Sequence, residues 1–174
     1  MKTSTRYVMA ILSVLAGVSQ EPKTSSPLQK RLMRDGKKLH KQTVKLQIWK
    51  KKIETIPFVR LLNLKLISLD EDGLVMRVKV VPKLLNFMGG VHGGGISSLI
   101  DTAVYFAIRP FVPGEKVLST TELKINFFRA AGKGSLEARS RILHLGKRTA
   151  VGEAEVVDEK GRLVAKGTAG HLIA

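Results

Sequence analysis

The 174-residue chain contains no cysteine, so disulfide bonds, thiolate metal ligands and cysteine nucleophiles are all excluded. Aromatic residues make up only 5% of the sequence, and its four histidines, His40, His92, His144 and His171, show no spacing typical of a metal site. The sequence also lacks the Gly-x-Ser-x-Gly motif of serine hydrolases and the Gly-x-x-x-x-Gly-Lys-Ser/Thr motif of phosphate-binding loops. We therefore expect a protein that works without a metal or another bound cofactor.

Acidic residues are scarce. Asp and Glu number 14 against 30 Lys and Arg, which gives a formal net charge of +16 at pH 7. The imbalance is strongest in residues 1–55, with 13 basic and 3 acidic side chains, against 17 and 11 in the remainder. Such a chain is attracted to polyanions. No recognition motif with interleaved aromatic residues accompanies the basic stretch Lys30 to Lys52, so we expect a solvated helix face or weak contact with an anionic membrane there, and no specific nucleic-acid binding.

The apolar run near the N-terminus, Tyr7–Val18, is too short to cross a membrane, which takes about 20 residues. It has the outline of a signal peptide without a small-x-small cleavage site, and the absence of acids before Glu21 is also typical of a mitochondrial presequence. A short amphipathic helix is the third interpretation. These interpretations stay open beside the cytoplasmic location that we expect. Residues 20–27 are typical of a linker, so we divide the chain into a basic N-terminal extension, 1–43, and a folded domain, 44–174.

The folded domain shows one long helical pattern set among strand patterns. Residues 44–56 scatter apolar side chains through a basic helix that Pro57 should close, and a second, longer helix follows a glycine-rich loop and ends before Pro110. Strand patterns, separated by turns that contain glycine, cover residues 64–69, 74–81, 117–128, 135–145, 148–157 and 162–173. One long helix among about six antiparallel strands predicts an α+β fold.

The most informative motif is Asn86-Phe-Met-Gly-Gly-Val-His92-Gly93-Gly94-Gly95, followed by a helical pattern that carries Asp101. Unpaired N–H groups at a helix start can stabilise a developing oxyanion, and a nearby carboxylate can activate water. At 100° per residue, Asp101 falls about 140° from Ile96, on the shoulder of the apolar face. That face consists of Ile96, Ile100, Ala103 and Ala107, with Leu99 and Phe106 flanking it. These features point to the hydrolysis of an acyl compound.

The chain resembles the hotdog-fold acyl-CoA thioesterases of the PaaI-like type, named after phenylacetic acid degradation. The resemblance lies in the spacing of Asn86, His92-Gly93-Gly94 and Asp101, and in the later segment Ser119-Thr-Thr-Glu-Leu-Lys-Ile-Asn-Phe-Phe-Arg-Ala130. It covers about residues 56–174. It implies that a curved antiparallel sheet wraps the long helix, that the chains form homodimers or homotetramers, and that active sites lie between two chains.

The resemblance also implies roles for individual residues. Asp101 would be the general base that activates water, or the nucleophile that attacks the thioester. The Gly93 N–H would polarise the thioester carbonyl, Asn86 would hold that oxygen or the water, and His92 would shape the loop. Thr120 would orient the water. Asp101 and Thr120 would belong to one subunit and the loop to its neighbour.

Coenzyme A carries a 3′-phosphate and a diphosphate, so a site that uses it should place cations at its mouth. Lys147 and Arg148, at a turn between two strand patterns, are the first candidates, and Arg129 is the second. The backbone of Gly94 is a further candidate for contact with the substrate at the helix start. The pair Gly89-Gly90 departs from the family pattern, which has at most one glycine there, and predicts a looser loop.

Each of these residues also has a structural explanation. His92 would then bond only to the loop backbone, the glycines would permit positive φ angles, and Thr120 would be an ordinary strand residue. Two functions stay open: an enzyme that hydrolyses acyl-CoA to free acid and CoA, and a non-catalytic acyl-CoA-binding module or regulator whose basic N-terminus contacts nucleic acid or a protein. Asp101 favours the enzyme, because a sensor has no use for a base.

Overall fold

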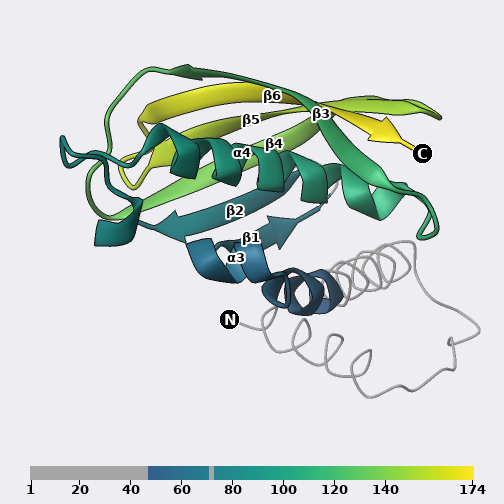
Figure 1. The fold of residues 1–174 in the computed structure, drawn as a ribbon, viewed down its shortest axis with the longest axis horizontal. Coiled ribbons are helices and arrows are strands. Elements are labelled where there is room, and N and C mark those ends of the chain that lie inside the picture. The colour runs from purple at the N-terminus through teal and green to yellow at the C-terminus, as the bar shows by residue number, and fades with distance from the viewer. Residues whose placement is uncertain (1–46, 71–72) are drawn as a thin grey trace, which may run out of the picture. The chain divides into compact units, whose positions relative to one another are not determined.

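The computed structural model describes residues 47–70 and 73–174 (Figure 1). The predictions for the extension 1–43, with its targeting and membrane interpretations and its boundary, lie outside these residues. The chain divides into two compact units, and the second, residues 49–174, contains every element discussed below. Within the described ranges, no helix has the length and apolar character that crossing a membrane requires.

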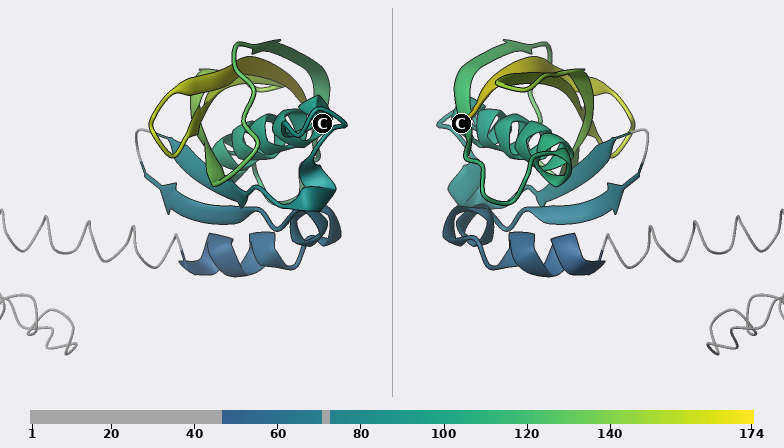
Figure 2. Two further views of the ribbon diagram at one scale, coloured as in Figure 1. Left: turned by 90° about the vertical axis from the view of Figure 1, so that its left-hand side faces the viewer. Right: turned by 90° about the vertical axis from the view of Figure 1, so that its right-hand side faces the viewer.

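In the described part of the chain, six strands form one antiparallel sheet in the spatial order β1-β2-β4-β5-β6-β3. The strands are β1 (Lys65–Leu69), β2 (Leu74–Lys79), β3 (Leu118–Phe127), β4 (Ser135–Leu145), β5 (Thr149–Asp158) and β6 (Leu163–Ile173). The sheet curves round the long helix α4 (Gly93–Ile108), as the end views in Figure 2 show. The predicted α+β class and hotdog arrangement are confirmed.

The apolar face of α4 packs on the sheet, and small residues allow a close approach. The six side chains assigned to this face and its flanks are all buried, at most 5% exposed. A Cβ at Gly152 on β5 would lie 2.6 Å from Cγ1 of Val104 on the helix, whereas a Cβ at Gly167 on β6 would lie nearest to the Lys124 carbonyl oxygen of β3, at 2.8 Å. The buried Ser140 hydroxyl of β4 lies 3.0 Å from the Ala103 carbonyl oxygen. A larger side chain at Gly152 would therefore press on the helix that carries Asp101.

The structure adds short helical segments that the sequence patterns do not predict. Residues 49–54 are helical as expected, but Pro57 begins a further helix, α3 (Pro57–Leu62), where the sequence predicts only a helix end. Proline suits the first turn of a helix because its fixed φ is preorganised and its missing N–H has no acceptor to lose. The 3-10 helices η1 (Pro82–Leu84) and η2 (Arg109–Phe111) also have proline in their first turn. Segments this short show no apolar periodicity.

Strand β3 forms one edge of the sheet and is exposed at eight of its ten residues. A β-bulge interrupts its pairing with β6 between Thr120 and Glu122. In a regular strand Thr120 and Phe127, seven residues apart, would point to opposite faces of the sheet. The bulge adds one unpaired residue between them, so both side chains point to the face that carries α4. Leu123, in phase with Phe127, is 39% exposed, and Phe127 is 53% exposed. The helix side of β3 is therefore an uncovered apolar strip.

Candidate active site

The loop before α4 is held together by Asn86. Its side-chain oxygen accepts hydrogen bonds from the backbone N–H groups of Met88 (2.9 Å) and Gly90 (3.1 Å). Gly89 has a φ of +78°, which only glycine adopts readily. A Cβ at Gly132 would lie 2.4 Å from the Gly89 carbonyl oxygen, so the loop packs tightly on the chain that follows β3. The prediction of a looser loop is therefore wrong, because the two glycines permit a tight turn. The side-chain oxygen of Asn86 accepts hydrogen bonds from the backbone N–H groups of this turn and is therefore already engaged within the loop.

The start of α4 is capped by His92, whose backbone is extended (φ −58°, ψ 138°). Its Nδ1 accepts a hydrogen bond from the Gly94 N–H at 2.9 Å. His92 therefore bonds to backbone, as its structural explanation holds, and the Gly94 N–H is occupied. The Gly93 N–H donates to no acceptor among the described residues, so one amide at this helix start is available to another molecule. The Phe127 ring lies 3.5 Å from where a Gly93 Cβ would stand.

Asp101 lies two turns further along α4 and is half-buried, on the shoulder that the helical wheel predicts. Its Oδ1 accepts a hydrogen bond of 2.9 Å from the Thr120 hydroxyl of β3. The structure thus brings Asp101 and Thr120 together within one chain. The second carboxylate oxygen, Oδ2, accepts no side-chain hydrogen bond from the described residues. One oxygen is held in place, and the other can accept a proton from water.

A third member of this cluster, His171 of β6, was not predicted from the sequence. Its Nε2 lies 3.3 Å from the same Thr120 hydroxyl, and the side chain is only 1% exposed. Burial lowers the pKa of His171. The negative charge of the Asp101 carboxylate and the backbone of Ala169 act in the opposite direction, toward a higher pKa. The available signal was its position: strand 162–173 alternates, and His171 stands in the inward phase with Ala169 and Ile173.

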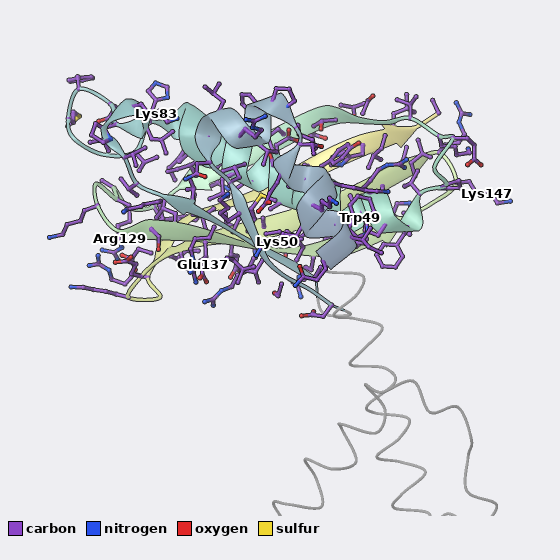
Figure 3. The ribbon with its side chains drawn as sticks, turned by 90° about the horizontal axis from the view of Figure 1, so that it is seen from below. Trp49, Lys50, Lys83, Arg129, Glu137 and Lys147 are labelled. Atoms are coloured by element: carbon purple, nitrogen blue, oxygen red, sulfur yellow. The ribbon has the colours of Figure 1, made fainter. Side chains whose placement is uncertain are left out.

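One copy of the chain does not bring the loop and the carboxylate together. Gly93 and Asp101 are eight residues apart on α4, a rise of about 12 Å. The candidate nucleotide-binding cations are also separated, because Lys147 and Arg129 lie at opposite ends of the long axis (Figure 3). Arg148 shares the turn of Lys147. The predicted catalytic residues therefore form two groups, Asp101 with Thr120 in one and the Asn86–Gly93 loop in the other, and the three candidate cations belong to neither.

A depression in the surface of the described residues lies near the helix start and not at Asp101. It is lined by residues of α3, η1 and the first turns of α4 together with the helix cap, and Asp101 is not among them; they are Leu62, Lys83, Leu84, His92, Gly94, Gly95 and Ser98. Within residues 47–70 and 73–174, no three acidic or histidine side chains are grouped to hold a metal ion. The chemistry that the cluster supports is proton transfer or nucleophilic attack by a carboxylate.

Proteins with similar sequences include two enzymes named for the hydrolysis of CoA thioesters. The acyl-coenzyme A thioesterase PaaI of Escherichia coli is 32% identical over 105 residues, which cover 60% of this chain and 73% of that protein. The 1,4-dihydroxy-2-naphthoyl-CoA hydrolase of the same organism is 29% identical over 124 residues, or 67% of this chain and 91% of that protein.

Solved structures agree with the sequence relatives. The Escherichia coli PaaI protein superposes with a TM-score of 0.64 at 28% identity, covering 70% of this chain and 86% of that chain. A mutant of the phenylacetic acid degradation protein PaaI from Thermus thermophilus superposes with a TM-score of 0.61 at 32% identity, covering 67% of this chain and 98% of that chain. The thioesterase superfamily model matches residues 88–165, which include α4 and strands β3, β4 and β5. By fold, by sequence identity and by its helix-start motif, the chain belongs to the thioesterase superfamily of hotdog-fold proteins.

Proposed function

We propose that the protein hydrolyses acyl-CoA thioesters to a free acid and CoA. The observation that carries the proposal is the hydrogen bond between Thr120 and Asp101, which fixes a half-buried carboxylate on the helix that begins with the Gly93 N–H. The activities for which the relatives are named, those of an acyl-CoA thioesterase and of a 1,4-dihydroxy-2-naphthoyl-CoA hydrolase, support the same reaction.

The chemistry needs a base or nucleophile and an oxyanion donor. With Oδ1 bonded to Thr120, Oδ2 of Asp101 takes a proton from water while the water oxygen attacks the thioester carbon. The carbonyl oxygen gains negative charge, which a helix-start N–H such as that of Gly93 stabilises. Collapse breaks the C–S bond, and the departing thiolate recovers the proton. Direct attack by the carboxylate would give an anhydride that water then cleaves; both routes use the same residues.

Pairing of β3 with β3 of a second copy would complete the site. No described residue pairs with the outer edge of β3, so its backbone groups are free to bond to another strand. An antiparallel pairing centred near Leu123 would put Thr120 of one copy opposite residue 126 of the other. Phe127 follows directly, and its ring contacts Gly93. The Gly93 N–H of one copy would thus approach Asp101 of the other, and the apolar strip on β3 would be covered.

The same symmetry would bring the cations together. A two-fold axis across β3 reverses the long axis, so the end of one copy that carries Lys147 would meet the end of the other that carries Arg129 (Figure 3). Cations from both copies would then stand at the mouth of one site, where the phosphates of CoA need them. We therefore propose a homodimer, or a tetramer of such dimers, as the active form.

Release of free thiol from a panel of acyl-CoAs of different chain length tests the proposal. We expect release with the wild type and almost none with Asp101→Asn. A protein that binds acyl-CoA but releases no thiol from any member of the panel would instead be the non-catalytic module.

A further inference from the structure

His171 is a buried polar side chain in the middle of an otherwise apolar inward face. It stands on β6 between Ala150 of β5 and Thr120 of β3, its partners in the two strand ladders. On the helix side its ring centroid lies 6.1 Å from that of Tyr105. Histidine is costly in such a place unless its nitrogen atoms are bonded, so this position calls for a reason.

The bonds of Thr120 determine which nitrogen of His171 carries the proton. The Thr120 hydroxyl has one proton, and the ionised carboxylate of Asp101, 2.9 Å away, can only accept it. The hydroxyl oxygen must then accept from Nε2 of His171, 3.3 Å away, which requires a proton on Nε2. The three side chains thus form a directed chain, from the His171 Nε2–H to the Thr120 O–H to Asp101.

The second nitrogen of His171 agrees with this direction. Nδ1 is buried and has no hydrogen-bond partner among the residues that the structure describes. In the neutral ring with the proton on Nε2, Nδ1 holds only a lone pair and has no proton to donate, so it can stay buried without a partner at less cost than an N–H group. Desolvation lowers the pKa of this ring, which favours the neutral form, while the Asp101 carboxylate and the Ala169 backbone oppose the shift.

We propose that His171 is a positioning residue: its Nε2–H orients the Thr120 hydroxyl so that this group holds Asp101 in one rotamer, with Oδ2 directed at the reacting water or thioester. The proposal rests on the proposed thioester hydrolysis. His171 lies behind Thr120 and does not touch the substrate. It acts by reducing the number of orientations that the carboxylate can adopt, so it should affect turnover more than substrate binding.

Three substitutions separate this role from simple packing. His171→Gln places an amide N–H where the Nε2–H stood, His171→Asn places its amide at the Nδ1 position, and His171→Leu fills the space without a donor. We expect kcat within about threefold of wild type for Gln, and about tenfold lower for Asn and Leu, with KM nearly unchanged in all three. In a Thr120→Val background, the Gln and Leu variants should have equal kcat, because the link to Asp101 is already absent.

Nitrogen-15 NMR of the imidazole rings provides a readout that does not depend on activity. The signal of His171 is the one that the Gln variant lacks, and we expect a neutral ring protonated on Nε2 whose shift changes in Thr120→Val. A proton on Nδ1, or a Leu variant as active as the Gln variant, would overturn the role of His171 while leaving the hydrolysis intact. A wild type that releases no thiol would overturn the proposed function and this role with it.

Discussion

Strands β3 and β5 are both ten residues long, yet they differ in their surroundings. β5 has a neighbour on each side, buries its inward residues against α4, and pairs its outward Glu153 with Arg141 and Lys166. β3 has one neighbour, is mostly exposed, and leaves the apolar Leu123 and Phe127 uncovered. The fold is complete around β5 but not around β3. Substitutions near β5 should therefore change stability, whereas those near β3 should change chemistry and assembly.

The largest effect should come from the carboxylate held by β3. Asp101→Asn keeps the size of the side chain but removes the base, so we expect turnover to fall by at least about a hundredfold with an unchanged melting temperature. Rates of thiol release and thermal melts measure the two quantities. Thr102→Ala, at the next position of α4, should alter neither much. Turnover of folded Asp101→Asn within a few-fold of wild type would remove this residue from the mechanism.

The next effect concerns the uncovered strip of β3. Leu123→Glu would bury an unpaired charge where two copies meet, so we expect the dimer dissociation constant to rise at least about a hundredfold and activity to fall as the protein is diluted. Sedimentation at several concentrations measures the first. Lys124→Glu, on the opposite face of the strand, is the matched control. A folded Leu123→Glu monomer with full activity would show that the active site does not need a second copy paired with β3.

A substitution on β5 should do the reverse. Gly152→Ala would place a Cβ 2.6 Å from Val104 Cγ1, and we expect the free energy of unfolding to fall by about 1–3 kcal/mol. Activity per folded molecule should change little. Gly114→Ala, which meets nothing within 4 Å, is the control for adding a methyl group. Equal stability of the two variants would mean that α4 does not depend on close contact with β5.

The smallest effect concerns the cations at the mouth of the site. Lys147→Ala combined with Arg148→Ala should raise the KM for acyl-CoA several-fold and weaken its dependence on salt, because the attraction to the phosphates of CoA is lost. A short thioester without the nucleotide should be cleaved as before. Lys65→Ala, on the far edge strand β1, is the control. Equal losses on both substrates would assign the two residues to the fold.

Much of the fold could be predicted because single-chain periodicity encodes it. The face of α4 follows from apolar residues at helical spacing, and β4, β5 and β6 follow from alternation between glycine turns. The spatial order of the strands could not be predicted, since edge and central strands have similar local patterns. The bulge in β3 was also hidden: it depends on pairing with β6, not on the residues of β3 alone.

The candidate site could be predicted only where its residues are close in sequence. The helix start and Asp101 share one segment, and the family resemblance added Thr120. His171 is 51 residues beyond Thr120 along the chain, and only the β3–β6 ladder brings the two side chains together. The loop was misjudged for a related reason, because counting glycines does not show that Asn86 bonds to the N–H groups that they expose.

We propose that each site takes its carboxylate from one copy and its oxyanion donor from another. Gly93→Pro can test the donor by itself: proline removes the N–H, suits the first position of a helix, and follows a residue whose backbone is already extended. We expect a stable fold and a loss of turnover of about a hundredfold or more. Gly93→Ala keeps the N–H and should stay active.

The most direct measurement is thiol release by mixed dimers formed by refolding two inactive variants together. Asp101→Ala with Gly93→Pro should recover about a quarter of wild-type activity, because about half of the dimers are hybrids and each hybrid holds one intact site. Asp101→Ala with Thr120→Val, whose changes lie in the same half of the site, should recover none beyond the Thr120→Val activity already present. We expect recovery with the first pair alone. No recovery with the first pair, although hybrid dimers form, would contradict a site shared between two copies.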